Sequence, residues 1–470
     1  MRRDPPETGG VETPYMGFPE RRSSRFLTAL VAAAVGIAFA DSSIVVLALP
    51  QLYGHFRTSI EGVSWVVTAY NAAVAVAAFG LIALIRRIPA KGILGAGLLV
   101  FLAASIACSL AGSLAFLIAA RCVQGVGAAL LLAGALPVLG ALTGSVARGA
   151  AIWTLAGTFG IAVGPALGGV LTQVFDWRAI FAAQAPVAAL GLIAALAAPR
   201  GAALEEGWRS SLTRTWPANA CLGLLFGALV GVLFLSVLLV ITVWGYSPIA
   251  GAGIVSVLPA ATLAARPLGR WLGGITAICG GAALVAAGLV ALALLPSPSA
   301  ALAAGALAFC GIGVGLAVPT LSGAALDPGA GLARSGTFTV GVRHLGLVLA
   351  LASIAPLLAA ELPDAGRQAK LKATSVLLDA PIGLSTKVPV ALDLAGEFER
   401  AQAGEVPDLA KPFNGHGAGT DPQIAATRDT LVGTIEETIT RAFRPAFLLS
   451  AALAALALAV AFFARRRVLQ

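Results

Sequence analysis

Charge is scarce in this sequence. Lys, Arg, Asp and Glu make up 11% of its 470 residues, whereas soluble domains carry roughly 25%. Hydrophobic residues make up 58% of the chain, and the mean hydropathy is +0.91. This composition excludes an ordinary soluble domain and predicts a polytopic membrane protein.

Several signatures of chemistry are also missing. The sequence has no Gly-x-x-x-x-Gly-Lys loop, which argues against transport driven by ATP. It has no His/Glu metal motif and no nucleophile elbow, so we expect neither an enzyme nor a metal or other cofactor. The five cysteines imply no disulfide framework, because all of them lie in apolar segments: Cys108, Cys122, Cys221, Cys279 and Cys310.

The net charge of +9 raises the question of a nucleic-acid partner. We reject nucleic acid, because the arginines cluster at the ends of apolar segments rather than on one polar face. Residues 1–25 are polar and rich in Pro and Arg, and no signal-peptide core precedes the first apolar run. We therefore interpret 1–25 as a cytoplasmic N-terminal tail.

Twelve apolar segments are each long enough to span the hydrocarbon core of a bilayer. Lys and Arg gather in the loops on one side, whereas the short loops on the other side hold only Arg57 and Arg178, so both termini are expected in the cytoplasm. The polar stretch 199–216 is expected to be a cytoplasmic linker between a bundle at 26–198 and a second at 217–470. The segments lie near 26–49, 64–85, 92–112, 114–138, 149–172, 179–198, 217–243, 248–268, 273–295, 300–322, 334–360 and 445–464.

An insertion at 361–440 separates the last two segments. Acidic residues outnumber basic ones in it, which suits an extracytoplasmic location. Asp421 and Pro422 are a helix start signal, and Leu431, Ile435 and Ile439 form an apolar stripe at helical spacing. We expect one helix from 422 to 463, about 60 Å long at 1.5 Å per residue, with a bend at Pro445.

The remaining part of the insertion is expected to pack against this helix. The apolar stripe needs a partner, and Leu371, Leu377 and Leu378 are the candidates. Residues 386–390 are expected to form a short extended piece, and 414–417 a loop tip. The insertion would shield an exit path or dock an extracytoplasmic partner; the alternative is a disordered acidic insert.

Glycines dominate the fifth apolar segment. Gly160, Gly164 and Gly168 recur every four residues, so another backbone can approach this helix face closely. Pro165 frees one carbonyl, which a neighbouring helix can satisfy. The pattern alone is also compatible with an ordinary packing face. However, Gly160-x-x-x-Gly164-Pro165-x-x-Gly168-Gly169 resembles the antiporter motif of major facilitator superfamily exporters.

Asp41 is the only acidic residue well inside an apolar segment. A charge near the bilayer centre costs about 2.5–3.5 kcal/mol on insertion scales, so Asp41 needs a partner or a cavity. The stretch 40–50 resembles the first-helix signature of drug/proton antiporters. That resemblance implies a role in proton coupling or cation sensing, whereas the alternative is a permanently paired acid that only fixes helix packing.

Arg121 is the expected partner of Asp41. It begins a stretch, 121–129, that resembles the family motif Arg-x-x-Gln-Gly-x-Gly-Ala-Ala, whose arginine faces the first helix. An arginine favours the ionised carboxylate and burial disfavours it, so opening a cavity would change the balance between loading and releasing a proton. Gln124 is a candidate for lining the cavity or holding Arg121, and equally for a packing hydrogen bond.

Other polar residues are candidates for lining a central cavity. Tyr70 and Asn71 end a stretch that resembles the start of the family's second helix. Arg343 and His344 lie about ten residues into the eleventh segment, near mid-membrane at about 1.5 Å per residue. An arginine there is expected to face the cavity. It would bind an anionic substrate, pair with a lipid headgroup, or serve structure alone.

Two departures from the family pattern stand out. The family's loop between helices two and three normally carries an aspartate that latches the two halves, and here that position is Leu84. The motifs resemble those of drug antiporters with fourteen helices, yet no extra helix pair separates the two halves.

The resemblance implies an all-α membrane protein with twelve helices in two six-helix bundles. We predict a secondary active transporter of a bacterial plasma membrane that exports hydrophobic or amphiphilic small molecules by proton-coupled alternating access. Its partners would be protons, membrane lipid and the small-molecule substrate. The alternatives are export of a lipid or lipid-like molecule and, in a different class, a non-transporting receptor or scaffold.

Overall fold

A computed structural model describes residues 21–85, 87–198, 215–326, 331–400, 409–416 and 418–465. Every regular element in these ranges is helical, and twelve spans are long and apolar enough to cross a membrane. The prediction of an all-α protein with twelve membrane helices is therefore confirmed. The expected tail and the expected linker at 199–216 lie almost entirely outside the described residues.

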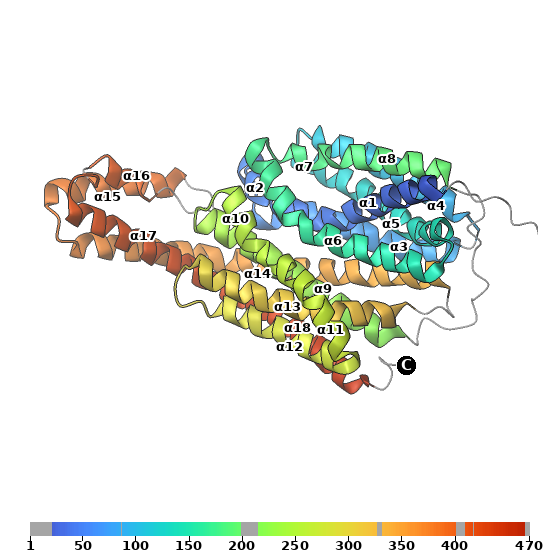
Figure 1. Ribbon diagram of the computed structural model, residues 1–470. Helices are drawn as coiled ribbons and strands as arrows, with labels where there is room; N and C mark the ends of the chain where they lie inside the picture. The colour runs from blue at the N-terminus through green and yellow to red at the C-terminus, as the bar shows by residue number, and fades with distance from the viewer. Residues whose placement is uncertain are drawn as a thin grey trace, which may run out of the picture.

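The first six spans form one bundle (Figure 1). A short helix, α2 (Leu49–Phe56), follows the first span, and a break at Ala183 divides the sixth span in two. The spans are α1 (Arg21–Val46), α3 (Ile60–Leu84), α4 (Ala90–Ser109), α5 (Leu114–Thr143), α6 (Val146–Val174), and α7 (Arg178–Ala182) with α8 (Gln184–Ala197).

The other six spans form the second bundle. The seventh ends in a π-helical turn, the eighth is broken at Ser256, and the twelfth is interrupted at Phe443, next to the expected bend at Pro445. The spans are α9 (Trp216–Val237) with η2 (Leu238–Val243), α10 (Pro248–Val255) with α11 (Val257–Leu272), α12 (Gly274–Ala293), α13 (Ala300–Ala325), α14 (Leu332–Asp379), and α17 (Pro422–Ala442) with α18 (Arg444–Phe463).

Serine residues set where several of these helices begin. Ser59, Ser113, Ser145, Ser247 and Ser299 have extended backbones, and each hydroxyl accepts a hydrogen bond from an N–H of the first helical turn. Such caps satisfy donors that have no partner inside the helix. Ser113 thereby separates two spans that are almost continuous in hydropathy.

The two bundles meet along a small set of helices. α14 packs against α3 and α5, and α6 packs against α10 and α11. Residues of α6, α11 and α14 also line a cavity between the two bundles.

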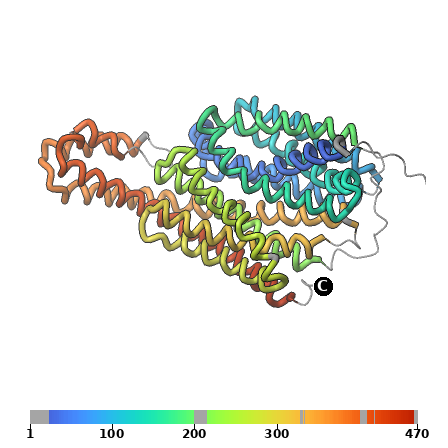
Figure 2. Tube along the Cα trace, viewed as in Figure 1, coloured from blue at the N-terminus to red at the C-terminus, as the bar shows by residue number. Residues whose placement is uncertain are grey.

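The insertion forms a helical projection beyond one end of the bundles (Figure 2). We call residues 361–440 the projection. α14 continues into it without a break, α15 (Leu384–Arg400) and α16 (Lys411–Asn414) form its tip, and α17 returns to the membrane part. Its apolar core is continuous with that of the second bundle. The described part of the insertion is therefore ordered and helical.

The helix start expected at Asp421 is confirmed. The Asp421 carboxylate accepts a hydrogen bond from the Gln423 N–H at 2.8 Å, and Pro422 is the first helical residue. The stripe Leu431, Ile435 and Ile439 is buried. Its expected helical spacing is therefore confirmed as well.

Two of the three expected partners of this stripe are wrong. Leu377 is 6% exposed, whereas Leu371 and Leu378 are 73% and 68% exposed. α14 instead presents small residues at intervals of four, Ala365, Ala369 and Ala373, in line with Leu377. Leu371 and Leu378 lie off this line, because only residues three or four apart share a helix face.

The extended piece expected at 386–390 is also wrong, because these residues lie inside α15. Val390 is buried in the apolar core of the projection, which stabilises the helix there. Tertiary packing thus overrides local preference, even with Pro389 inside the helix. Of the loop tip expected at 414–417, Asn414 is instead the last residue of α16, Gly415 and His416 form the turn that follows, and Gly417 lies outside the described residues.

The projection predicts a specific pattern of hydrogen exchange. Amides of 424–440 should exchange slowly in the purified protein. Ile435→Ala should lower the free energy of local opening by about 2–5 kcal/mol and so speed exchange in α17, because it empties a buried position. Thr430→Ala, at an exposed position of the same helix, is the control and should change little. Fast exchange throughout α17 in the unmodified protein would contradict the fold.

Candidate functional site

A buried ion pair lies inside the first bundle. Asp41 from α1 and Arg121 from α5 are both 0% exposed. Arg121 Nη1 and Nη2 donate to the two carboxylate oxygens of Asp41 at 2.8 and 2.6 Å. The structure therefore brings together the two residues that the sequence paired, in the two-pronged geometry that makes an Arg–carboxylate contact strong.

Further hydrogen bonds satisfy the pair. Arg121 Nε donates to the Val66 carbonyl of α3 at 2.9 Å, and Nη1 also donates to Gln124 Oε1 at 2.6 Å. Gln184 Nε2 donates to Asp41 Oδ1 at 2.8 Å, and Gln124 Nε2 donates to Gln184 Oε1 at 2.8 Å. A buried charge pair is tolerated only when its remaining donors and acceptors are satisfied in this way.

Gln184 was missed by the sequence analysis. It is 0% exposed and closes the ring of hydrogen bonds between Asp41 and Gln124. The available signal was a single amide side chain in an otherwise apolar sixth span.

Tyr70 and Asn71 support the pair rather than line a cavity in this conformation. The Arg121 guanidinium lies 4.2 Å from the centre of the Tyr70 ring, and the Tyr70 hydroxyl donates to the Ala38 carbonyl of α1 at 2.8 Å. Asn71 Oδ1 accepts from Ser42 Oγ at 3.1 Å. Both side chains thereby connect α3 to α1, the helix that carries Asp41. Gln124 is likewise fully buried in the network.

The glycine face of α6 receives the same helix. A Cβ atom on Gly160 would overlap the Gly36 carbonyl of α1, and one on Gly164 would overlap the Ser43 hydroxyl. A Cβ atom on Gly168 would lie 2.7 Å from the Ile44 carbonyl. Close packing against α1 therefore requires glycine at these three positions. Gly169 points elsewhere, and a Cβ there would overlap Ala252 of α10 in the second bundle.

Pro165 frees the carbonyl of Ile161, four residues earlier. Ser43 Oγ of α1 lies 3.3 Å from this oxygen and donates to it, in addition to a 2.8 Å bond to its own Ala40 carbonyl. A neighbouring helix thus satisfies the freed carbonyl, as the sequence predicted. The glycine face and the proline together hold α1 in place at Ser43, which lies two residues after Asp41.

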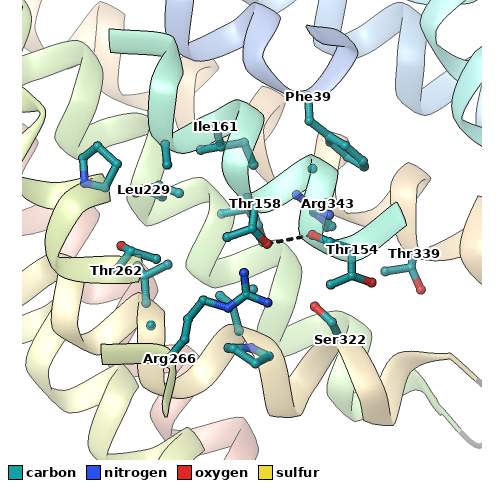
Figure 3. Close-up of a pocket in the computed structure, with 18 of the residues that line it drawn as sticks. Phe39, Thr154, Thr158, Ile161, Leu229, Thr262, Arg266, Ser322, Thr339 and Arg343 are labelled. Carbon is teal, nitrogen blue, oxygen red and sulfur yellow. Dashed lines mark hydrogen bonds between the residues drawn. The ribbon is translucent and has the colours of Figure 1, made fainter. Parts of the chain in front are cut away.

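A cavity lies between the two bundles (Figure 3). It contains about 820 Å³ of atom-free space, part of it open to solvent. One part of its lining lies toward the end of the molecule opposite the projection, where α1 begins and α18 ends (Figure 1). This part comprises Arg266 of α11, Ser322 of α13 and Thr339 of α14. The apolar part of the wall includes Phe39, Ile161, Phe226, Leu229, Leu258, Val314 and Val318.

Arg343 and His344 reach this region from α14. Arg343 lines the cavity and is 9% exposed, and its guanidinium lies 3.8 Å from the centre of the Phe226 ring and 4.7 Å from that of Phe39. His344 lines an adjoining hollow with Ser42, Ser43 and Arg343. Asp41 immediately precedes Ser42, so the ion pair and the cavity share the same stretch of α1.

Two helical bundles around a central cavity, with a sealed ion pair beside it, are the architecture of a membrane transporter. The family model for the Major Facilitator Superfamily matches residues 31–360. The chain therefore belongs to the major facilitator superfamily, a family of transporters and not of enzymes.

Solved structures agree on the fold. A bacterial homologue of the human lysosomal transporter Spinster, in an inward-facing and unoccupied conformation, has a TM-score of 0.64 and 17% identity, over 96% of this chain and 98% of that one. The xylose transporter XylE from E. coli has a TM-score of 0.58 and 13% identity, over 71% and 91% of the two chains.

Curated relatives include resistance proteins. The multidrug resistance protein Stp of Mycobacterium tuberculosis is 35% identical over 175 residues, which is 36% of this chain and 33% of the relative. The methylenomycin A resistance protein of Bacillus subtilis is 34% identical over 181 residues, 37% of this chain and 39% of the relative. The chain therefore spans about a third of the length of the curated relatives it matches.

The ion pair predicts a rescue by double substitution. Arg121→Gln should destabilise the protein by about 3–5 kcal/mol, because it leaves the Asp41 carboxylate buried without a counter-charge. Adding Asp41→Asn should recover most of this loss, since the neutral amide no longer needs an arginine. Thermal unfolding in detergent measures both effects. Equal stability of the single and double variants would show that the two side chains are not coupled.

The glycine face predicts that transport depends on the absence of a side chain at Gly164. Gly164→Leu should abolish transport while the protein is still made and folded, because the new side chain displaces Ser43 and with it α1. Gly95→Leu is the matched control, since a Cβ on Gly95 of α4 meets no atom within 4 Å. Transport assays and size-exclusion profiles of both variants test this. Normal transport by Gly164→Leu would show that α1 does not need this close approach.

Proposed function

We propose that this transporter exports hydrophobic or amphiphilic small molecules in exchange for protons, by alternating access across a bacterial plasma membrane with both termini in the cytoplasm. The observation that carries this proposal is the sealed Asp41–Arg121 pair next to the cavity. The resistance and efflux proteins among the relatives support the direction of transport.

The proposed coupling follows from what holds Asp41. Its carboxylate accepts three hydrogen bonds, two from Arg121 and one from Gln184. A proton on Asp41 would weaken the contact with Arg121 and loosen α1 from α5. Because α1 also forms part of the cavity wall, the protonation of Asp41 and the shape of the cavity would change together.

The glycine face is proposed as the hinge of this movement. α6 holds α1 on one side through Gly160, Gly164 and Gly168, and it touches α10 of the second bundle through Gly169. A helix that contacts both partners so closely transmits a shift of one bundle to the other. The cavity wall is mostly apolar, which suits a substrate with a large apolar body.

A second candidate is the export of a lipid or lipid-like molecule. The projection carries a groove whose apolar lining includes Leu377, Leu384, Val388 and Phe398; Lys370 and Lys387 also line it. Such a groove suits an acyl chain after it leaves the cavity. Mass spectrometry of the purified protein would favour this candidate if a lipid co-purifies and is lost in Leu384→Asp. Neither the fold nor the relatives give support to a non-transporting receptor or scaffold.

Asp41→Asn should abolish efflux driven by a pH gradient. The assay uses proteoliposomes and three fluorescently labelled decyl amphiphiles with anionic, neutral and cationic headgroups, while an internal dye reports proton movement. Asp176→Asn is the matched control, because Asp176 also pairs with an arginine, Arg178, but at an exposed site and 3.6 Å away. Efflux by folded Asp41→Asn protein at the unmodified rate would refute proton coupling at this residue.

A further inference from the structure

Arg343 has unused capacity for binding. No carboxylate in the described part of the chain pairs with it, and its buried Nε makes no hydrogen bond. Its guanidinium lies over the rings of Phe39 and Phe226. Rings attract the cation, but a guanidinium has five N–H donors in its plane that suit the oxygens of a carboxylate or phosphate.

Among the described residues, the charged side chains that line the cavity around Arg343 are arginines. Arg266 of α11 also lines it, and Figure 3 shows its side chain extending into the space. None of the described residues that line the cavity, or the adjoining hollow beside His344, is an Asp or Glu. Asp41 does not offset this charge, because it is sealed from the cavity and already neutralised by Arg121.

The other residues that line the cavity indicate what chemistry of ligand suits it. Thr154, Thr158, Thr262 and Ser322 supply hydroxyl groups, and the rest of the wall is mostly aliphatic or aromatic. Charges of one sign in a low-dielectric cleft concentrate ligands of the opposite sign and exclude ligands of the same sign. An arginine and several hydroxyl groups in an otherwise apolar wall describe a site for a molecule with a small anionic head and an apolar body.

We infer that the central cavity binds amphiphilic anions, with the carboxylate or phosphate head on Arg343, and that it disfavours amphiphilic cations. This inference rests on the proposed function, since it names the substrate class for the same cavity. It assigns Arg343 a role in choosing the substrate, whereas Asp41 and Arg121 handle the proton.

Calorimetric titration of the full-length protein in phosphatidylcholine nanodiscs tests the inference, with empty nanodiscs subtracted. The probes are decyl phosphate, decanol and decyltrimethylammonium, which share a tail and differ in head charge. Decyl phosphate should bind tighter than decyltrimethylammonium by about 10- to 100-fold, the range expected for a hydrogen bond to a charged group. Equal binding, or a preference for the cation, would overturn the inference.

Substitutions locate the effect. Arg343→Gln should weaken the binding of decyl phosphate by about 10- to 100-fold and leave the binding of decanol unchanged. Arg343→Lys should keep the preference for the anion, because it keeps the charge while losing the planar contact with the rings. If Arg343→Gln binds decyl phosphate as tightly as the unmodified protein does, the arginine serves packing alone and the inference is wrong. Arg441→Gln, at an exposed position near the end of α17, is the control.

The result separates the two proposals. Binding is measured without a pH gradient. A transport assay that shows no proton coupling would therefore not affect the inference about the anion site. A preference for the cation overturns the anion site but not export through the cavity, whereas no binding by any probe overturns both. Nanodiscs that contain phosphatidylglycerol distinguish the sources of the anion. If phosphatidylglycerol weakens the binding of decyl phosphate, and Arg343→Gln removes this competition, a membrane lipid can occupy the site. If phosphatidylglycerol does not compete, the anion is a separate solute.

Discussion

An ion pair that has no access to water constrains the whole first bundle. Removing two charges from water costs several kcal/mol each, so the pair persists only where every donor and acceptor is satisfied. Here that requirement draws in four further groups: the Val66 carbonyl, Gln124, Gln184 and, through Gln124, Ser105. They come from α3, α5, α8 and α4. The helices of this bundle are therefore held in register by one polar centre rather than by apolar packing alone.

The position of Asp41 depends in turn on how closely α1 approaches α6. In a bilayer the hydrophobic effect does not drive helices together, so contact is gained by bringing backbones close where side chains are small. Gly160 against Gly36 is such a contact, and Ser43 adds a hydrogen bond to the carbonyl that Pro165 frees. Packing and polar chemistry thus act on the same helix, on opposite faces. This explains why a glycine motif distant in sequence bears on a carboxylate.

Much of this was open to prediction from sequence, for physical reasons. Hydropathy alone yields the twelve spans. A lone acid in an apolar span needs a partner, and the resemblance of 121–129 to a family motif indicated Arg121. The ring through Gln184 was not predictable, because it depends on the rotation of α8 about its axis. The same limit explains the wrong choice of Leu371 and Leu378, since nearby leucines lie on different faces. The prediction of an extended piece at 386–390 was wrong because packing of the buried Val390 outweighs the preference of valine for extended structure.

α14 connects features that the sequence presents as separate. At 48 residues it is about 72 Å long at 1.5 Å per residue, more than twice the roughly 30 Å hydrocarbon core. It contacts α3 and α5 of the first bundle, carries Arg343 at the cavity, and forms one side of the projection. Under the proposed alternating access, a rocking of the second bundle would move Arg343 and the projection together. Because the tip lies farthest from the cavity, it would move farthest. The projection is therefore better understood as an extension of the moving bundle than as an appended domain.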